Sequence, residues 1–174
     1  MKILVILTLF FSFLYAFEYD KLLLKAQAFT FPKIVVLDTL YRKKLNDGQV
    51  EIAILYSKQD ELDAIFMKKE IDNKFNANIS NSELKITLVE FSKLIEKYTA
   101  YIALKGSSRM LQTIAAKAQN EKRILFAYDY DDMKNGALVS LSVEERTNLF
   151  LNKKQLKNSG VNFNDAIFQI ASFR

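Results

Sequence analysis

The sequence contains no cysteine, no histidine and no tryptophan, and it has one proline and four glycines in 174 residues. Without cysteine the chain can form no disulfide and cannot sense redox state through a thiol. Without histidine it cannot build imidazole metal sites or the serine and cysteine triads that use an imidazole base. We therefore expect a protein with no catalytic residue, no cofactor and no metal site.

The remaining composition is that of an ordinary globular protein. Half of the residues are hydrophobic and 26% are charged, which is enough apolar sequence to build a core. The net charge of +5 is small, and the basic residues are scattered along the chain instead of gathering on one face. Nucleic acid is therefore not an expected partner.

The amino terminus, MKILVILTLFFSFLYA, has the pattern of a secretory signal peptide. Lys2 precedes an apolar run at residues 3–11, and the small residue Ala16 provides a cleavage site. An uncleaved membrane anchor is the alternative, but the run is shorter than the roughly 20 residues that span a bilayer. We expect a signal peptide at residues 1–16, export to the periplasm, and no stable membrane insertion of residues 17–174 after cleavage.

Residues 17–174 predict a single α/β domain. Helices are expected at 19–29, at 33–45 after Pro32, and from Ser57 to about residue 75, where Ser57 and Asp60 resemble a capping box. Short, continuously apolar strands are expected at 51–56, 84–91, 100–104 and 123–128, with helical segments between them. This alternation predicts a mainly parallel sheet covered on both faces, in a three-layer α/β/α sandwich.

The segment GALVSLSVEERTNLFLN, residues 136–152, alternates apolar and polar residues on either side of a charged reversal. It predicts an antiparallel hairpin that closes the parallel fold. A short helix at 153–158 should end at Gly160, and a last helix at 165–173 should be capped by Asn162 or Asn164.

The hairpin has two interpretations, which the sequence leaves open. It can simply close the core under the last helix, or it can form an edge ribbon that pairs with another chain. In the second case the candidate partner or dimer surface contains Arg146, Asn148 and Phe150.

The last third of the chain resembles the closing segment of the YfiR-like (HmsC-like) family of periplasmic proteins. The resemblance rests on the order and spacing of Gly136, Ala137-Leu138-Val139, Asn152, Lys153-Lys154, Gly160 and Ile167-Phe168-Gln169-Ile170-Ala171. It extends back to the α/β units from about residue 51. It departs from the family before that point, where Phe31-Pro32 stands in place of a tryptophan-proline pair.

This resemblance implies a non-catalytic periplasmic regulator. Its partner would be an inner-membrane diguanylate cyclase or a related sensor protein, which it would bind and restrain in cyclic di-GMP signalling of the biofilm type. The family resemblance also implies a candidate homodimer. The cysteine-based redox response of some relatives cannot apply to a chain without cysteine.

Two polar segments suggest an alternative function, a small exported ligand-binding module for an anion or metabolite. Gly106, Ser107, Ser108 and Arg109 precede a predicted helix and could offer backbone N–H groups and a positive charge to an anion, although they lack P-loop spacing. A turn in which serine simply caps the helix explains the same residues.

The second segment, Asp129-Tyr130-Asp131-Asp132, follows a predicted strand, where open α/β sheets present ligand sites. Its carboxylates could bind Ca²⁺ or Mg²⁺, but the spacing is not that of an EF-hand, and a solvated acidic turn is the simpler interpretation. Tyr128, Tyr130 and Phe126 could form an aromatic ligand wall or belong to the core. The candidate crevice therefore contains Gly106, Ser107, Ser108, Arg109 and Asp129.

Overall fold

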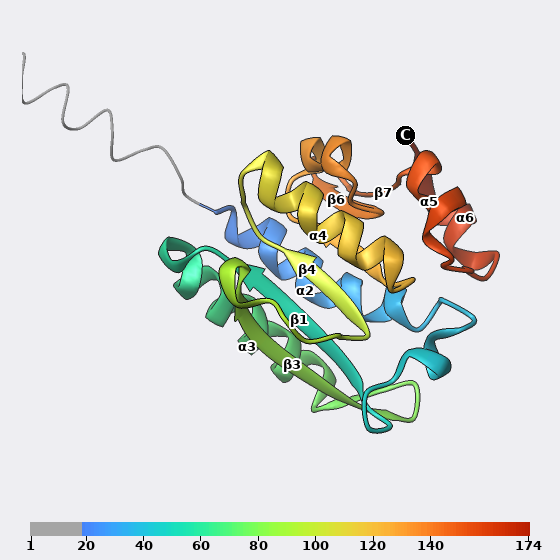
Figure 1. Ribbon diagram of the computed structural model, residues 1–174, viewed down its shortest axis with the longest axis horizontal. Coiled ribbons are helices and arrows are strands. Elements are labelled where there is room, and N and C mark those ends of the chain that lie inside the picture. The colour runs from blue at the N-terminus through green and yellow to red at the C-terminus, as the bar shows by residue number, and fades with distance from the viewer. Residues whose placement is uncertain (1–18) are drawn as a thin grey trace, which may run out of the picture.

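The computed structural model describes residues 19–174, and the expected signal peptide lies outside this part. The described chain forms one eight-stranded sheet in the order β2-β3-β1-β4-β5-β6-β7-β8, with helices on both faces (Figure 1). The strands are β1 (Val50–Tyr56), β2 (Asn78–Ile79), β3 (Ser82–Glu90), β4 (Ala100–Ala103), β5 (Ile124–Ala127), β6 (Val139–Val143), β7 (Thr147–Leu151) and β8 (Ala171–Phe173). The α-helices are α2 (Lys21–Val35), α3 (Glu61–Phe75), α4 (Ser108–Asn120), α5 (Lys153–Ser159) and α6 (Ala166–Ile170). Among residues 19–174, no helix is long and apolar enough to cross a bilayer.

The predicted three-layer α/β fold with its closing hairpin is confirmed. Strands β3, β1, β4, β5 and β6 pair in parallel, and β6 and β7 form the antiparallel hairpin. The chain leaves β1 toward β3 and then returns to the other side of β1 to build β4, β5 and β6. This reversal places the topological switch point of the sheet between β1 and β4.

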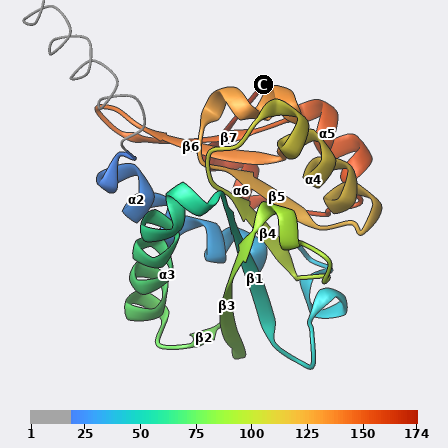
Figure 2. The same ribbon diagram turned by 60° about the vertical axis from the view of Figure 1, so that its left-hand side comes forward.

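Burial on both faces of the sheet explains the continuous apolar strands. In β1, Ile52 and Ile54 belong to the core shared with α2 and α3, whereas Ala53 and Leu55 belong to the core shared with α4. Figure 2 shows α2 and α3 on one side of the sheet and α4 and α5 on the other. A strand covered on both sides needs apolar residues at every position, which is the pattern of EIAILY.

The prediction of two helices before β1 was wrong. A single helix, α2, runs past Pro32 and ends at Val35, and the only helical segment in residues 36–45 is a 3₁₀ turn at Tyr41–Lys44. The missing N–H of Pro32 removes one bond near the end of the helix, and the apolar side chains of α2 stay buried as far as that end. Burial of the apolar face of α2 therefore outweighs the tendency of Pro32 to interrupt the helix.

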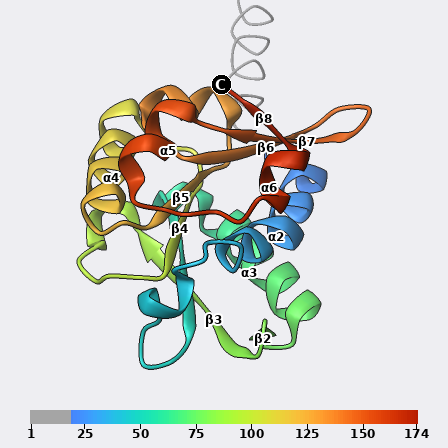
Figure 3. The ribbon, with the colours of Figure 1, turned by 90° about the vertical axis from the view of Figure 1, so that its right-hand side faces the viewer.

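The prediction of a final helix through residue 173 was also wrong. Helix α6 ends at Ile170, and the next three residues form β8, which pairs in parallel with β7. The backbone groups of β7 would otherwise be unpaired at the edge of the sheet, and β8 pairs with them from Leu149 to Leu151. Figure 3 shows β8 beside β7, while the tip of the β6–β7 hairpin extends outward.

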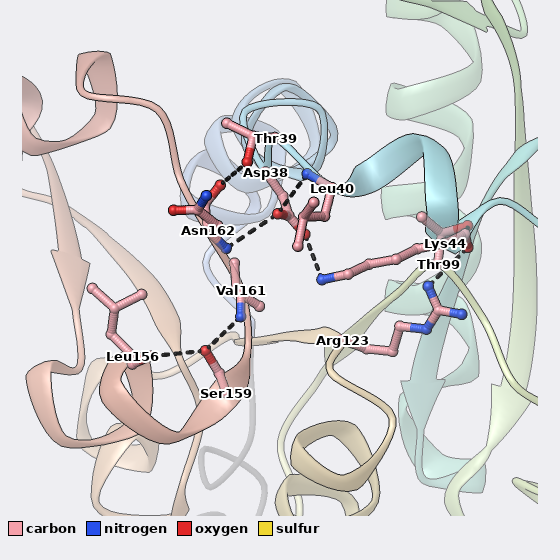
Figure 4. Close-up of polar contacts among 10 residues, drawn as sticks. All are labelled: Asp38, Thr39, Leu40, Lys44, Thr99, Arg123, Leu156, Ser159, Val161 and Asn162. Atoms are coloured by element: carbon pink, nitrogen blue, oxygen red, sulfur yellow. Dashed lines mark hydrogen bonds and ion pairs between the residues drawn. The ribbon is translucent and has the colours of Figure 1, made fainter.

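A buried polar network closes the amino end of the sheet (Figure 4). Lys44 forms an ion pair with Asp38 at 2.5 Å. The carbonyl oxygen of Lys44 accepts hydrogen bonds from Oγ1 of Thr99 at 3.1 Å and Nη1 of Arg123 at 2.9 Å, and these residues precede β4 and β5. Asp38 also accepts the backbone N–H of Asn162 at 3.2 Å. Buried polar contacts therefore hold together the segments at the amino ends of the parallel strands.

Candidate functional site

Four side chains from separate parts of the chain meet where the parallel strands reach their carboxyl ends, beside the switch point. We call this side of the sheet the carboxyl edge. Tyr19 precedes α2, Asp60 lies between β1 and α3, Lys105 follows β4, and Tyr128 follows β5. We call these four residues the switch-point cluster. Open α/β sheets bind their ligands at this place, because the loops that leave neighbouring strands diverge to opposite faces there.

Two tyrosines and a lysine form the aromatic part of the cluster. The Tyr19 and Tyr128 rings lie 4.6 Å apart, and Nζ of Lys105 lies 4.6 Å from the first ring centroid and 5.4 Å from the second. The Tyr19 hydroxyl accepts the backbone N–H of Lys105 at 2.8 Å, and the Tyr128 hydroxyl accepts that of Asp20 at 2.9 Å. Burial raises the pKa of both tyrosines, so both remain neutral phenols at physiological pH.

Asp60 supplies a buried negative charge to the cluster. Its side chain is almost inaccessible, with the residue 4% exposed, and its Oδ2 has no hydrogen-bond partner. Burial raises the pKa of this carboxyl and the charge of Asp63 adds to the rise, while Tyr19 and Lys105 lower it. Leaving a buried carboxylate oxygen unpaired costs free energy, and such groups call for an explanation beyond packing.

The local backbone explains how Asp60 reaches this position. The predicted capping box is absent, since neither Ser57 nor Asp60 makes a side-chain capping bond to the following helix. Instead, the N–H of Asp60 donates to the carbonyl of Ser57 at 2.7 Å, and the segment Lys58–Asp60 forms a 3₁₀ turn. The side chain of Asp60, at the N-cap position of α3, interacts with Tyr19 and makes no capping bond to the helix.

The predicted crevice residues lie near this edge but do not form one site. Ser107 caps α4 by accepting the N–H of Met110 at 3.3 Å, and Ser108 is exposed. A Cβ on Gly106 would lie 3.2 Å from the ring of Phe91, so that ring covers the glycine. Arg109 lines a pocket of about 200 Å³ over α4 with Phe91, Met110, Thr113 and Ile114. The structure therefore places Arg109 away from the switch-point cluster.

Asp129 lies at the same edge and is used by the fold. Its carboxylate accepts the N–H of Asp131 at 3.0 Å and caps the 3₁₀ helix Tyr130–Asn135. The neighbouring Asp132 accepts a hydrogen bond from the Asn135 amide at 3.0 Å. Within residues 19–174 there is no group of three or more histidine, cysteine or carboxylate side chains that could hold a metal ion.

The residues of the candidate partner surface do not form one exposed patch. Arg146 is exposed at the hairpin, and its carbonyl accepts the side-chain amide of Asn148 at 3.4 Å. Phe150 is half-buried against Tyr130, with ring centroids 4.3 Å apart, so it does not project beside Arg146. Near the carboxyl terminus of the chain, the exposed large apolar side chains belong to α6 and β8. They are Phe168, Ile170 and Phe173.

Sequence reasoning found only one member of the cluster. The sequence suggests Tyr128 as part of an aromatic ligand wall, whereas it predicts Tyr19 in a helix and Asp60 in a capping box and gives Lys105 no role. Each of these three residues lies at a strand or helix boundary, and this is the only sequence signal that could have found them.

Comparisons with known proteins identify the fold. The sequence matches no known family model and no curated protein sequence. A conserved domain protein from Vibrio cholerae O1 biovar El Tor is 15% identical with a TM-score of 0.55, over 80% of this chain and 59% of that one. The ligand-free, open structure of a substrate-binding protein with adhesive properties from Clostridium difficile is 12% identical with a TM-score of 0.54, over 78% and 57%. The chain thus spans less than two thirds of either protein, and the likeness is one of fold.

Proposed function

We propose that this protein is a non-catalytic ligand-binding module, exported to the periplasm, that captures a small metabolite at the switch-point cluster. The observation that carries the proposal is the Asp60 carboxylate, which is buried with an unpaired oxygen at the edge where open α/β sheets bind ligands. The likeness in fold to a substrate-binding protein supports the same conclusion.

The chemistry of the cluster suits binding better than catalysis. Asp60 would present an acceptor to a ligand donor. The Tyr128 ring and the N–H of Lys105, both in contact with Tyr19, would present an apolar face and a donor. The raised pKa values of Tyr19 and Tyr128 make these phenols poor proton acceptors near neutral pH. We therefore assign no proton-transfer step to these two tyrosines.

Thermal denaturation with a panel of small metabolites tests this function. A ligand that binds only the folded state at about 100 times its Kd adds roughly 2.7 kcal/mol to the unfolding free energy. The stabilisation should disappear in Asp60→Ala and persist in Asp131→Ala, which removes an exposed carboxylate from the same edge. Stabilisation that survives Asp60→Ala, or none from any class of metabolite, would contradict the proposal.

A second candidate function is the restraint of an inner-membrane diguanylate cyclase, which the family resemblance implies. The observation that favours it is the exposure of Phe168, Ile170 and Phe173, which are 38%, 66% and 51% accessible at the edge of the sheet. Exposed clusters of large apolar side chains are typical of protein-binding surfaces. The same surface could also join two copies of the chain.

Cellular cyclic di-GMP tests the second candidate. A strain that lacks the protein should contain more cyclic di-GMP than its parent if the protein restrains a cyclase. The full-length protein should restore the original level, and a version without residues 1–16 should fail to do so. An unchanged level under several growth conditions would remove this candidate.

A further inference from the structure

Tyr19 occupies the place beside the switch point where open α/β sheets generally bind their ligands. Its hydroxyl accepts the N–H of Lys105, a backbone donor located where β4 ends. Its ring lies against Tyr128 and below the Lys105 ammonium, and the residue is only 3% exposed. A ring stacked on an aromatic neighbour, with its hydroxyl held by a backbone N–H, is the environment that a bound aromatic ligand would have.

The unpaired oxygen of Asp60 points to the same kind of ligand. The carboxyl of Asp60 lies close enough to the Tyr19 hydroxyl for each to influence the other's pKa, yet its Oδ2 stays without a partner. A hydroxyl group can accept from the Lys105 N–H and donate to a carboxylate at the same time. The Tyr19 hydroxyl lies between these two groups, which is the position that the hydroxyl of a bound ligand would take.

Tyr19 can leave this position without disrupting the fold. The helix α2 begins two residues later, and its cap is the side chain of Asp20, which accepts the N–H groups of Leu22 and Leu23 at 2.8 and 3.2 Å. The polar contacts that hold the segment in place are those of the Tyr19 hydroxyl with Lys105 and of the Asp20 N–H with Tyr128. Tyr19 also belongs to the hydrophobic core, so its release exposes one ring while the Asp20 cap of α2 and the strand pairing of the sheet do not involve its side chain.

We propose that the switch-point cluster takes a small hydroxylated aromatic ligand of the phenol class, and that Tyr19 is a built-in occupant that the ligand displaces. This inference rests on the proposed ligand-binding function and specifies its ligand class and regulation. A site that is closed for most of the time binds its ligand more weakly, in proportion to the open fraction. Tyr19 thereby sets the ligand concentration at which the protein responds.

Calorimetric titration with para-cresol and toluene, which differ by the hydroxyl group, tests the inference. Tyr19→Ala should bind para-cresol at least about tenfold more tightly than the unmodified protein, and toluene at least about tenfold more weakly than para-cresol. Tyr41→Ala is the matched control, since Tyr41 is a buried tyrosine 9% exposed on a different segment, and it should bind para-cresol no more tightly than the unmodified protein. Adding Asp60→Ala to Tyr19→Ala should abolish the preference.

Equal binding of toluene and para-cresol by Tyr19→Ala, or no binding by the folded variant, would overturn the inference. If Tyr19→Ala does not fold, Tyr19→Phe replaces it, since it keeps the ring and loses the hydroxyl bond to Lys105. Tyr19→Phe should bind para-cresol more tightly than the unmodified protein, and equal affinity would also overturn the inference.

The ligand-binding function and the proposed ligand class can fail separately. If a metabolite of another class binds the unmodified protein and Asp60→Ala abolishes that binding, while para-cresol does not bind Tyr19→Ala, only the ligand class and the role of Tyr19 are wrong. If Tyr19→Ala binds neither para-cresol nor any metabolite of the panel, the proposed function fails as well.

Discussion

The ammonium nitrogen of Lys44 lies 2.5 Å from Oδ2 of Asp38, and the two side chains are only 10% and 2% exposed. Asp38 follows α2, Lys44 precedes β1, and the same carboxylate holds the N–H of Asn162 near the other end of the chain. Removing one charge from a buried pair leaves the other without water or a counter-ion. This pair should therefore be one of the most sensitive points of the fold.

Asp38→Asn should lower the free energy of unfolding by about 3 to 5 kcal/mol, because the Lys44 ammonium would stay buried and uncompensated. Urea denaturation measures the loss. Asp72→Asn is the control, because it breaks the Lys68–Asp72 pair on α3, whose side chains are 37% and 48% exposed. That change should cost no more than about 1 kcal/mol. Equal losses for the two variants would contradict this account of the amino-edge network.

Asp60→Asn should increase stability near neutral pH by roughly 1 kcal/mol, because a buried amide costs less than a buried carboxylate. Burial raises the folded pKa of Asp60 above its unfolded value. Between the two values the folded chain binds more protons than the unfolded chain, so the stability of the unmodified protein falls as pH rises through that window. The advantage of Asn should therefore be largest above the window and shrink as pH falls through it.

Urea denaturation of both proteins from neutral pH down to about pH 4 measures this difference. Asp131→Asn, a change of an exposed carboxylate at the same edge, should shift stability by less than about 0.5 kcal/mol. A stability loss in Asp60→Asn at neutral pH would mean that the carboxylate supports the fold and is not held there for a ligand.

Gly136→Ala should destabilise the protein by at least about 2 kcal/mol. Gly136 has φ +103°, and a Cβ there would lie 2.6 Å from the Cβ of Ala115 on α4. Gly48→Ala provides the control for backbone strain alone, because its φ is +80° and nothing lies within 4 Å of the added Cβ. That change should cost about 1 kcal/mol. Thermal denaturation of both variants checks whether close approach, beyond backbone conformation, requires glycine at position 136.

Ile170→Asp tests the candidate partner surface on α6 and β8. Since Ile170 is 66% exposed, the change should alter stability by less than about 0.5 kcal/mol. If this surface restrains a cyclase, cyclic di-GMP in the cell should rise to the level of the deletion strain. Ile95→Asp is the matched control, 86% exposed in the β3–β4 connection, and it should leave cyclic di-GMP unchanged. The same rise in both variants would show that this surface is not specific.

Local signals predicted the elements that depend on near neighbours. Ser107 caps α4 as expected, and Gly160 ends α5 as expected, with φ +63°. Each of these contacts spans no more than a few residues, so the sequence carries the whole signal. The same reasoning failed at Pro32, where burial of α2 against the sheet outweighed the helix-stopping tendency of proline.

The candidate site could not be predicted in this way. The Tyr19 hydroxyl meets the N–H of Lys105, which is 86 positions further along the chain, and neither residue belongs to a motif. The expected role of Asp60 was a local cap, but a 3₁₀ turn directs its carboxylate into the switch-point cluster. Strand β8 could not be predicted either, since Ala171, Ser172 and Phe173 continue a helical pattern. They form a strand because β7 offers an unpaired edge.

The sequence by itself determined the alternation of apolar strands and amphipathic helices, the closing hairpin, and the absence of thiol and imidazole chemistry, because these depend on composition and on contacts between near neighbours. Only the tertiary structure decided which strand ends lie together. The order of strands around β1 is set by burial of both faces of the sheet and by the crossovers between parallel strands. That order brings Tyr19, Asp60, Lys105 and Tyr128 to one edge, and no short segment of sequence contains this information.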